Sequence, residues 1–231
     1  MIISPHPQGS VEWLQARCGI PTASEFDNLI TPTGELRKGE MPKTYLATKL
    51  AEWWTGGIIE QFNSSFAMEQ GQILESEAVP WFELEYGVEI NRVGLCTTDD
   101  GKIGCSPDGL IGQTGIEIKC PRVDTHVGYL LAGVLPKQYT AQVQGCMFVT
   151  GARHWRFLSY CRRFPQLVLT VERDIEIQDA LHCALDSFLK AFEEGKARLC
   201  EMNGGPPRRE IRKPQAQHQQ AQEQDEIGVT P

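Results

Sequence analysis

An aspartate, a glutamate and a lysine lie close together in the stretch CSPDGLIGQTGIEIKCP, residues 105–121. Glu117 and Lys119 flank one isoleucine, and side chains two apart in a strand point to the same face, about 7 Å apart. Asp108 stands between proline and glycine in the preceding turn and can approach the same edge. Two carboxylates among apolar neighbours favour a hard cation such as Mg²⁺, which binds oxygen ligands. A lysine beside that cation can orient or deprotonate a water that attacks a phosphodiester.

The alternative interpretation of these three residues is a salt-bridged pair on a solvated sheet face. Such pairs are common and contribute roughly 0–1 kcal/mol. The rigid Pro–Asp–Gly setting, the second acid and the apolar flanking residues favour the cation site instead.

The elements that must position these groups are predicted from hydrophobic periodicity and turn residues. We expect helices over 19–30, 41–57, 65–87, 136–151 and 176–199, and strands over 89–96, 101–109, 115–121, 153–161 and 166–173. This order predicts one α/β domain, with helices flanking a mixed central β-sheet. The 65–87 helix should be kinked at Pro80. Its predicted apolar face is Leu74, Ala78, Trp81 and Leu84. The last helix should bury Ile177, Leu181, Leu185, Phe188 and Phe192.

Composition excludes several classes of protein. The chain has 231 residues, of which 41% are hydrophobic, and a net charge of −8. The eight cysteines form no CxxC pair, which excludes the usual zinc and iron–sulfur spacings. No apolar run could span a bilayer, and MIISPHPQGS lacks the regions of a secretory signal, so we expect a cytoplasmic protein without membrane contact. After Asn203 the chain is polar and glutamine-rich, which predicts a folded domain over 1–202 and a flexible tail over 203–231.

Further motifs surround the ionic trio in a consistent order. They are ARCGIPTASEF, EQGQILESEAVPWFE, CSPDGLI, IEIKCP and YTAQVQGCMFVTG. With the Asp-x8-Glu-x-Lys pattern of the PD-(D/E)xK nucleases, they closely resemble the phage lambda exonuclease family of viral recombination nucleases (the YqaJ-like group) over roughly residues 10 to 195. The resemblance implies a restriction-endonuclease-like core. It also implies Mg²⁺-dependent 5′–3′ digestion of one strand of duplex DNA from 5′-phosphorylated ends, which releases mononucleotides and leaves a 3′ single strand for annealing.

The resemblance also implies roles for single residues. Asp108, Glu117 and the Ile118 carbonyl would bind Mg²⁺, and Lys119 would activate the water. Glu75 would help to hold a second ion or its water, although it could also be a solvated helix acid. Two Mg²⁺ ions are expected, for which Mn²⁺ could substitute.

A second group of residues is implied to bind the terminal 5′ phosphate. Its members are Arg17, Thr22, Ser24, Ser106 and Gln142. An arginine fork and hydroxyls suit a dianion, whereas Thr22 or Ser24 alone could equally be a helix N-cap. Arg37 and Lys38, in a polar loop, are candidates for contact with duplex phosphates or are simply solvated. Pro21, Pro80 and the glutamine-rich tail depart from the motifs that carry the resemblance.

Partners and location follow from the same resemblance. It implies a homotrimeric ring on double-stranded DNA ends, a single-strand annealing protein as partner, and a phage or prophage origin with action in the bacterial cytoplasm. Three alternatives stay open: a RecB-like nuclease, a restriction-type endonuclease, and a noncatalytic DNA-end-binding scaffold. The missing cysteine quartet disfavours the first, the absence of a recognisable target-reading element the second, and Lys119 the third.

Overall fold

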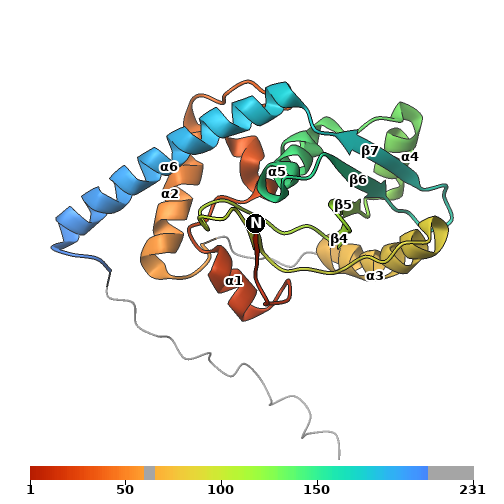
Figure 1. Cartoon of the computed structure of the whole chain (residues 1–231), viewed down its shortest axis with the longest axis horizontal. Helices are drawn as coiled ribbons and strands as arrows, with labels where there is room; N and C mark the ends of the chain where they lie inside the picture. The colour runs from red at the N-terminus through yellow and green to blue at the C-terminus, as the bar shows by residue number, and fades with distance from the viewer. Residues whose placement is uncertain (60–65, 208–231) are drawn as a thin grey trace, which may run out of the picture.

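The computed structural model describes residues 1–59 and 66–207, with side chains described from residue 74 in the second range. Its elements run along the chain as shown in Figure 1. They are β1 (Ile2–Ile3), α1 (Val11–Arg17), the 3₁₀ helix η1 (Ala23–Asn28), α2 (Glu40–Thr55), α3 (Phe66–Tyr86), β2 (Cys96–Thr97), β3 (Gly104–Cys105), β4 (Gly109–Ile111), β5 (Thr114–Lys119), α4 (Val123–Ala132), the 3₁₀ helix η2 (Lys137–Tyr139), α5 (Thr140–Thr150), β6 (His154–Ser159), β7 (Leu167–Glu172) and α6 (Ile175–Asn203).

A four-stranded mixed sheet in the order β4-β5-β6-β7 carries the ionic trio. β5 and β6 are parallel and pair Glu117 with Phe157, while β4–β5 and β6–β7 are antiparallel. The parallel pair requires a crossover, which α4, η2 and α5 provide. A small antiparallel sheet, β1-β2-β3, lies earlier in the chain. The predicted mixed sheet with flanking helices is therefore confirmed.

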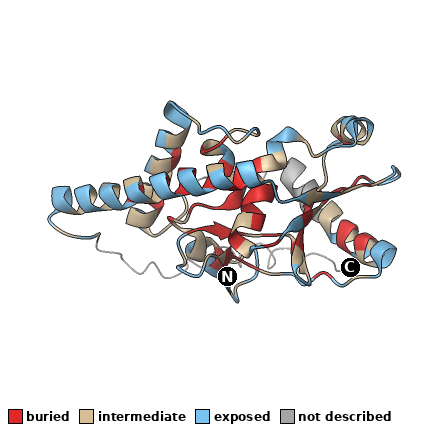
Figure 2. Ribbon diagram, turned by 45° about the horizontal axis from the view of Figure 1, so that its top comes forward, coloured by how far each residue is buried: buried red, intermediate tan, exposed pale blue. Residues whose placement is uncertain are grey.

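The sheet separates two apolar clusters. On one face, Phe157 packs in a cluster with residues of η1, α5 and α6. On the other face, Ile116 and Ile118 pack with Ala78 and Phe82 of α3. Figure 2 shows this buried interior beneath the exposed outer side of α6. Because side chains alternate along a strand, Glu117 must point away from α3 and toward the α5 side.

α6 forms as the sequence predicts. The Asp174 carboxylate accepts the Ile177 N–H at 3.1 Å and caps the helix, and Gly204 ends it in the left-handed conformation at φ +69°. The predicted apolar face is buried, which stabilises the fold by roughly 1.5–3 kcal/mol for each large side chain. It consists of Ile177, Leu181, Leu185, Phe188 and Phe192.

Other local predictions were wrong. Leu84 is 87% exposed, and Phe82 takes the buried position on α3. Leu84 lies six residues after Ala78, about 240° around a helix, whereas Phe82 lies only one turn away. The predicted helix over 19–30 is the six-residue η1, and Thr22 makes no side-chain capping bond there. Helices α1 and α4 were not predicted.

Pro80 lies inside α3, which continues to Tyr86. α6 extends to Asn203, so the expected tail begins at its end, and residues 208–231 of that tail lie outside the described residues. Across the described ranges, no helix has the length and apolar character needed to cross a membrane.

Candidate active site

Strand β5 brings Glu117 and Lys119 to one face, as its alternation predicts. Lys119 Nζ lies 2.5 Å from Glu117 Oε1. Gln142 of α5 also donates to Glu117 Oε1, at 2.7 Å. Glu117 is only 1% exposed, so its charge is held in the interior by one cation and one amide.

Asp108 reaches the same edge from the turn before β4. Its Oδ2 accepts the Ile118 N–H at 2.6 Å. Gly109 must follow, because a Cβ there would lie 2.1 Å from Ile90 Cγ2. The N–H and C=O of one strand residue point the same way, so the Ile118 carbonyl is directed to the side on which Asp108 lies. The structure thus brings together the two carboxylates, the lysine and the carbonyl that the sequence singled out.

The electrostatics of this group favour a bound cation. Burial, together with the charges of Glu117 and Glu75, raises the pKa of Asp108 well above its usual range. Burial alone would lower the pKa of Lys119, but Glu117 and Asp108 raise it above its ordinary value. Glu117 Oε2 is buried and has no hydrogen-bond partner among the described residues. A buried, unpartnered carboxylate oxygen is costly, and a divalent cation would satisfy it.

The number of protein ligands suits Mg²⁺. Across residues 1–59 and 74–207, no three His, Cys, Asp or Glu side chains gather into a ready-made metal site. Mg²⁺ usually keeps several waters and needs only one or two carboxylates. Asp108 and Glu117 with the Ile118 carbonyl therefore fit this ion, and a demanding all-protein cage is not required.

Glu75 lines a cavity with Asp108. The cavity measures about 500 Å³ and is also lined by Arg92 and by the N-terminal segment 3–8. Glu75 Oε1 accepts from Arg92 Nη1 at 3.1 Å, an ion pair that the sequence did not indicate. Glu75 acts on Asp108 through its charge, and its role as a ligand stays a prediction.

Four of the five predicted phosphate-binding residues are linked around Trp13. The Arg17 guanidinium stacks over the Trp13 ring at 4.4 Å, and Trp13 Nε1 donates to Ser106 Oγ at 3.1 Å. Arg17 also donates to Thr22 Oγ1 at 3.1 Å, which lies 3.4 Å from Ser24 Oγ. Trp13 was not predicted from the sequence, because its place four residues before Arg17 matters only on a helix and α1 was not predicted.

Gln142, the fifth residue, contacts the ionic trio instead, because its side-chain amide donates to Glu117 of β5. Its neighbour Gln144 is buried and instead binds the Glu172 carbonyl at 2.9 Å and the Asp174 N–H at 3.1 Å. The two glutamines therefore have different partners, and of the two only Gln142 contacts the ionic trio.

The candidate duplex-contact residues lie apart from this group. Arg37 is half-buried, and its guanidinium donates to the Asp27 carbonyl. Lys38 is exposed. Contact of either residue with DNA stays a prediction.

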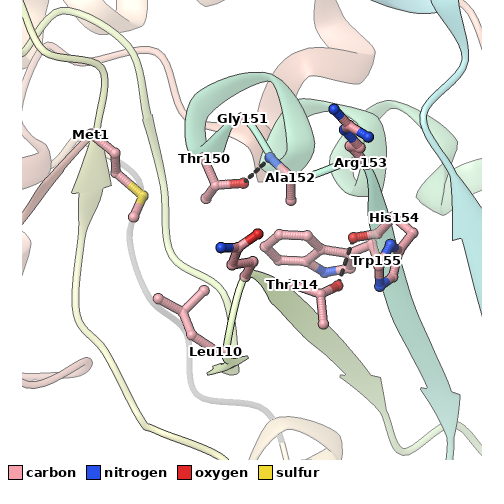
Figure 3. A pocket seen from close by; sticks show the side chains of 11 residues that line it. Met1, Leu110, Thr114, Thr150, Gly151, Ala152, Arg153, His154 and Trp155 are labelled. Atoms are coloured by element: carbon pink, nitrogen blue, oxygen red, sulfur yellow. Dashed lines mark hydrogen bonds between the residues drawn. The ribbon is translucent and has the colours of Figure 1, made fainter.

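A second cavity lies at the far end of β5 from Lys119 (Figure 3). It measures about 430 Å³, and the Thr114 hydroxyl donates to the His154 carbonyl at 2.6 Å beside the Trp155 ring. None of the predicted site residues lines it, whereas Glu75 and Asp108 line the cavity described above.

Comparison with known proteins gives a consistent result. The model of the YqaJ-like viral recombinase domain matches residues 12–153. The alkaline exonuclease LHK-Exo from Laribacter hongkongensis is 29% identical, over 84% of this chain and 98% of its own, with a TM-score of 0.75. The LHK-Exo complex with dAMP matches at 30% identity with the same coverage and TM-score.

A more distant structure shares the fold alone. A phage-related exonuclease from Haemophilus somnus 129PT is 14% identical over 78% of this chain and 96% of its own, with a TM-score of 0.62. No curated protein sequence matches the chain.

Proposed function

The chain belongs to the YqaJ-like viral recombinase family and is a nuclease of that family, and from this premise we propose that it is a Mg²⁺-dependent 5′–3′ exonuclease. It degrades one strand of duplex DNA from 5′-phosphorylated ends, releases mononucleotides and leaves a 3′ single strand for recombination by annealing. One observation carries the proposal: Asp108 and Glu117 converge beside Lys119 while a buried Glu117 oxygen has no partner among the described residues.

Asp108, Glu117 and the Ile118 carbonyl would hold the first Mg²⁺, and Glu75 would contribute to a second. Bound Mg²⁺ would supply electrophilic stabilisation of the negative charge that develops on the scissile phosphate. Mn²⁺ would substitute, because it also accepts oxygen ligands in octahedral geometry.

The protein's own groups position the reaction. Gln142 donates to Glu117 Oε1, which leaves the unpartnered Oε2 as the oxygen that would hold a cation. Lys119 Nζ lies between that carboxylate and the Tyr139 ring, 5.2 Å from the ring centroid. Its ammonium is 2.5 Å from Glu117 and would orient the attacking water.

The proposed polarity of digestion rests on the neighbouring cluster. Ser106 stands two residues before Asp108, so a 5′ phosphate held by Arg17 and Ser106 would place the chain end close to the cation site. Each cleavage would then release one mononucleotide and expose a new 5′ phosphate. Arg17, held by its stack on Trp13, supplies the charge that binds the dianion.

Assembly and partners belong to the same proposal. A net charge of −8 disfavours a broad basic face for DNA, whereas a homotrimeric ring would retain duplex ends by threading them. The 3′ strand would pass to a single-strand annealing protein, and digestion would take place in the cytoplasm of a bacterial host.

A digestion assay tests the proposal. Duplexes labelled at either end are incubated with the protein, with and without Mg²⁺, and the products are separated by size. We expect labelled mononucleotides from 5′ ends in the presence of Mg²⁺ alone. Digestion that is equally fast with EDTA, or internal cuts in a closed circle, would overturn the assignment.

A further inference from the structure

A buried ion network lies directly behind Thr22. Its members on α2 are Tyr45, Lys49 and Glu52, which share one helix face because they are four and then three residues apart. Lys49 is 5% exposed and Glu52 is 1% exposed. Lysine and glutamate are almost never this buried unless they are paired.

Lys49 joins two carboxylates from different parts of the chain. Its Nζ lies 2.9 Å from Glu25 Oε2 and 3.1 Å from Glu52 Oε2. Glu52 Oε2 also accepts the Gly19 N–H, at 3.0 Å. Lys49 therefore binds one end of the segment 19–25 directly, at Glu25, and the other end through Glu52, which holds the Gly19 N–H.

Thr22 transmits this arrangement to Arg17. Its hydroxyl donates to Glu25 Oε2 at 3.0 Å, so the oxygen presents a lone pair to Arg17 Nη2 at 3.1 Å. Its N–H donates to the Tyr45 hydroxyl at 3.3 Å. Because Thr22 is only 1% exposed, we expect it to orient the guanidinium rather than to contact the phosphate itself.

The charges in this region are balanced. Arg17 and Lys49 oppose Glu25 and Glu52, and Tyr45 stays neutral because burial and Glu25 raise its pKa. Without Lys49, one carboxylate would be uncompensated close to the place where a phosphate dianion is expected to bind. Glu25 would then repel the dianion and attract Arg17, to which the Thr22 hydroxyl already links it.

We propose that Lys49 is a positioning residue that sets the preference for phosphorylated ends, because it compensates Glu25 and keeps Arg17 directed at the terminal phosphate. The inference rests on the proposed function, since it assigns a cause to the end preference of the same site. Lys49 touches neither DNA nor cation and acts through Glu25 and Thr22.

The test compares duplexes that differ only in a 5′ phosphate or 5′ hydroxyl. The measured quantity is the ratio of kcat/KM for the two ends. Lys49→Met should lower this ratio about tenfold. At an effective dielectric of about 20, an effect of about this size is expected from a unit charge that lies two to three times as far from the phosphate as a directly contacting charge would. The loss should be in KM for the phosphorylated duplex. Lys190→Met, which removes a lysine from the exposed side of α6, is the matched control.

A double variant that restores the charge balance distinguishes a positioning role of Lys49 from a purely structural one. Lys49→Met combined with Glu25→Gln removes one charge of each sign, so the end preference should return toward the wild-type ratio. If Lys49→Met is insoluble, Glu25→Gln alone decides: it should lower KM for phosphorylated ends, because it removes the opposing carboxylate.

Several outcomes would overturn the inference. They are a wild-type ratio in Lys49→Met, an equal loss on both kinds of end, no recovery in the double variant, or an unchanged or raised KM in Glu25→Gln. A wild-type protein with no preference for phosphorylated ends would instead contradict the proposed function, so the two failures are distinguishable.

Discussion

Replacing Arg17 by alanine tests the phosphate-binding cluster most directly. The guanidinium stacks on Trp13 at 4.4 Å and donates to Thr22 at 3.1 Å, so its fork is held in place before a ligand arrives. A charge-assisted hydrogen bond contributes about 1.5–3 kcal/mol against about 1 for a neutral one. Arg17→Ala should therefore reduce the preference for 5′-phosphorylated ends about 10- to 150-fold, whereas Ser24→Ala should reduce it only about fivefold.

The assay uses end-labelled duplexes with a 5′ phosphate or a 5′ hydroxyl, and compares kcat/KM for each. Arg17→Lys is the matched control, because it keeps the charge but loses the planar fork, and it should fall between wild type and alanine. Mg²⁺ binding measured by calorimetry should be the same in all these variants. If Arg17→Ala keeps the full wild-type preference, or if label leaves 3′ ends first, the cluster does not bind the 5′ phosphate.

Four further predictions follow from the site and the sequence. Asp108→Ala and Glu117→Ala should abolish Mg²⁺-dependent digestion and weaken Mg²⁺ binding, while Lys119→Met should lose digestion but keep Mg²⁺ binding by calorimetry; wild-type cleavage by any of them contradicts its role. Without metal, Asp108→Asn should raise Tm near neutral pH, about 2–4 °C for each kcal/mol gained. The pKa of Asp108 is raised in the folded state, so its carboxylate lowers stability as pH rises from the unfolded pKa through the folded one; a Tm difference that does not shrink on acidification would refute this reasoning. Light scattering should give about three times the 25.9 kDa chain mass, and a monomer that digests processively would contradict the ring. Deleting residues 204–231 should leave digestion intact, and failure of the truncated protein to fold would show that the tail belongs to the core.

The ionic trio and α6 could be predicted because the sequence pattern that specifies each of them lies within one short stretch of the chain. A period of two fixes which side chains of β5 share a face, and a period of 3.6 with a capping aspartate fixes α6. The association of Asp108 with that face is also nearly local, since it comes from the adjoining turn.

The network around Lys49 could not be predicted because its partners are distant in sequence. Lys49 and Glu52 look like a solvated pair on a helix, and their burial depends on Glu25 and Gly19, which approach from another part of the chain. Arg92 pairs with Glu75 in the same nonlocal way. Helix α4 gave no clear apolar stripe, because His126 is its only fully buried residue.

From the crossover between β5 and β6 we also expect a particular order of folding events. Asp108 and Glu117 are carried by one short hairpin, β4–β5, which can form on the microsecond timescale. The partners of Glu117 lie later in the chain. Gln142 lies on α5, and Phe157 of β6 pairs with Glu117 across the parallel ladder. Closing such a loop is slower than closing a hairpin. We therefore expect the nascent hairpin to carry its carboxylates still hydrated, and strong Mg²⁺ affinity to arise only when the second half of the sheet docks.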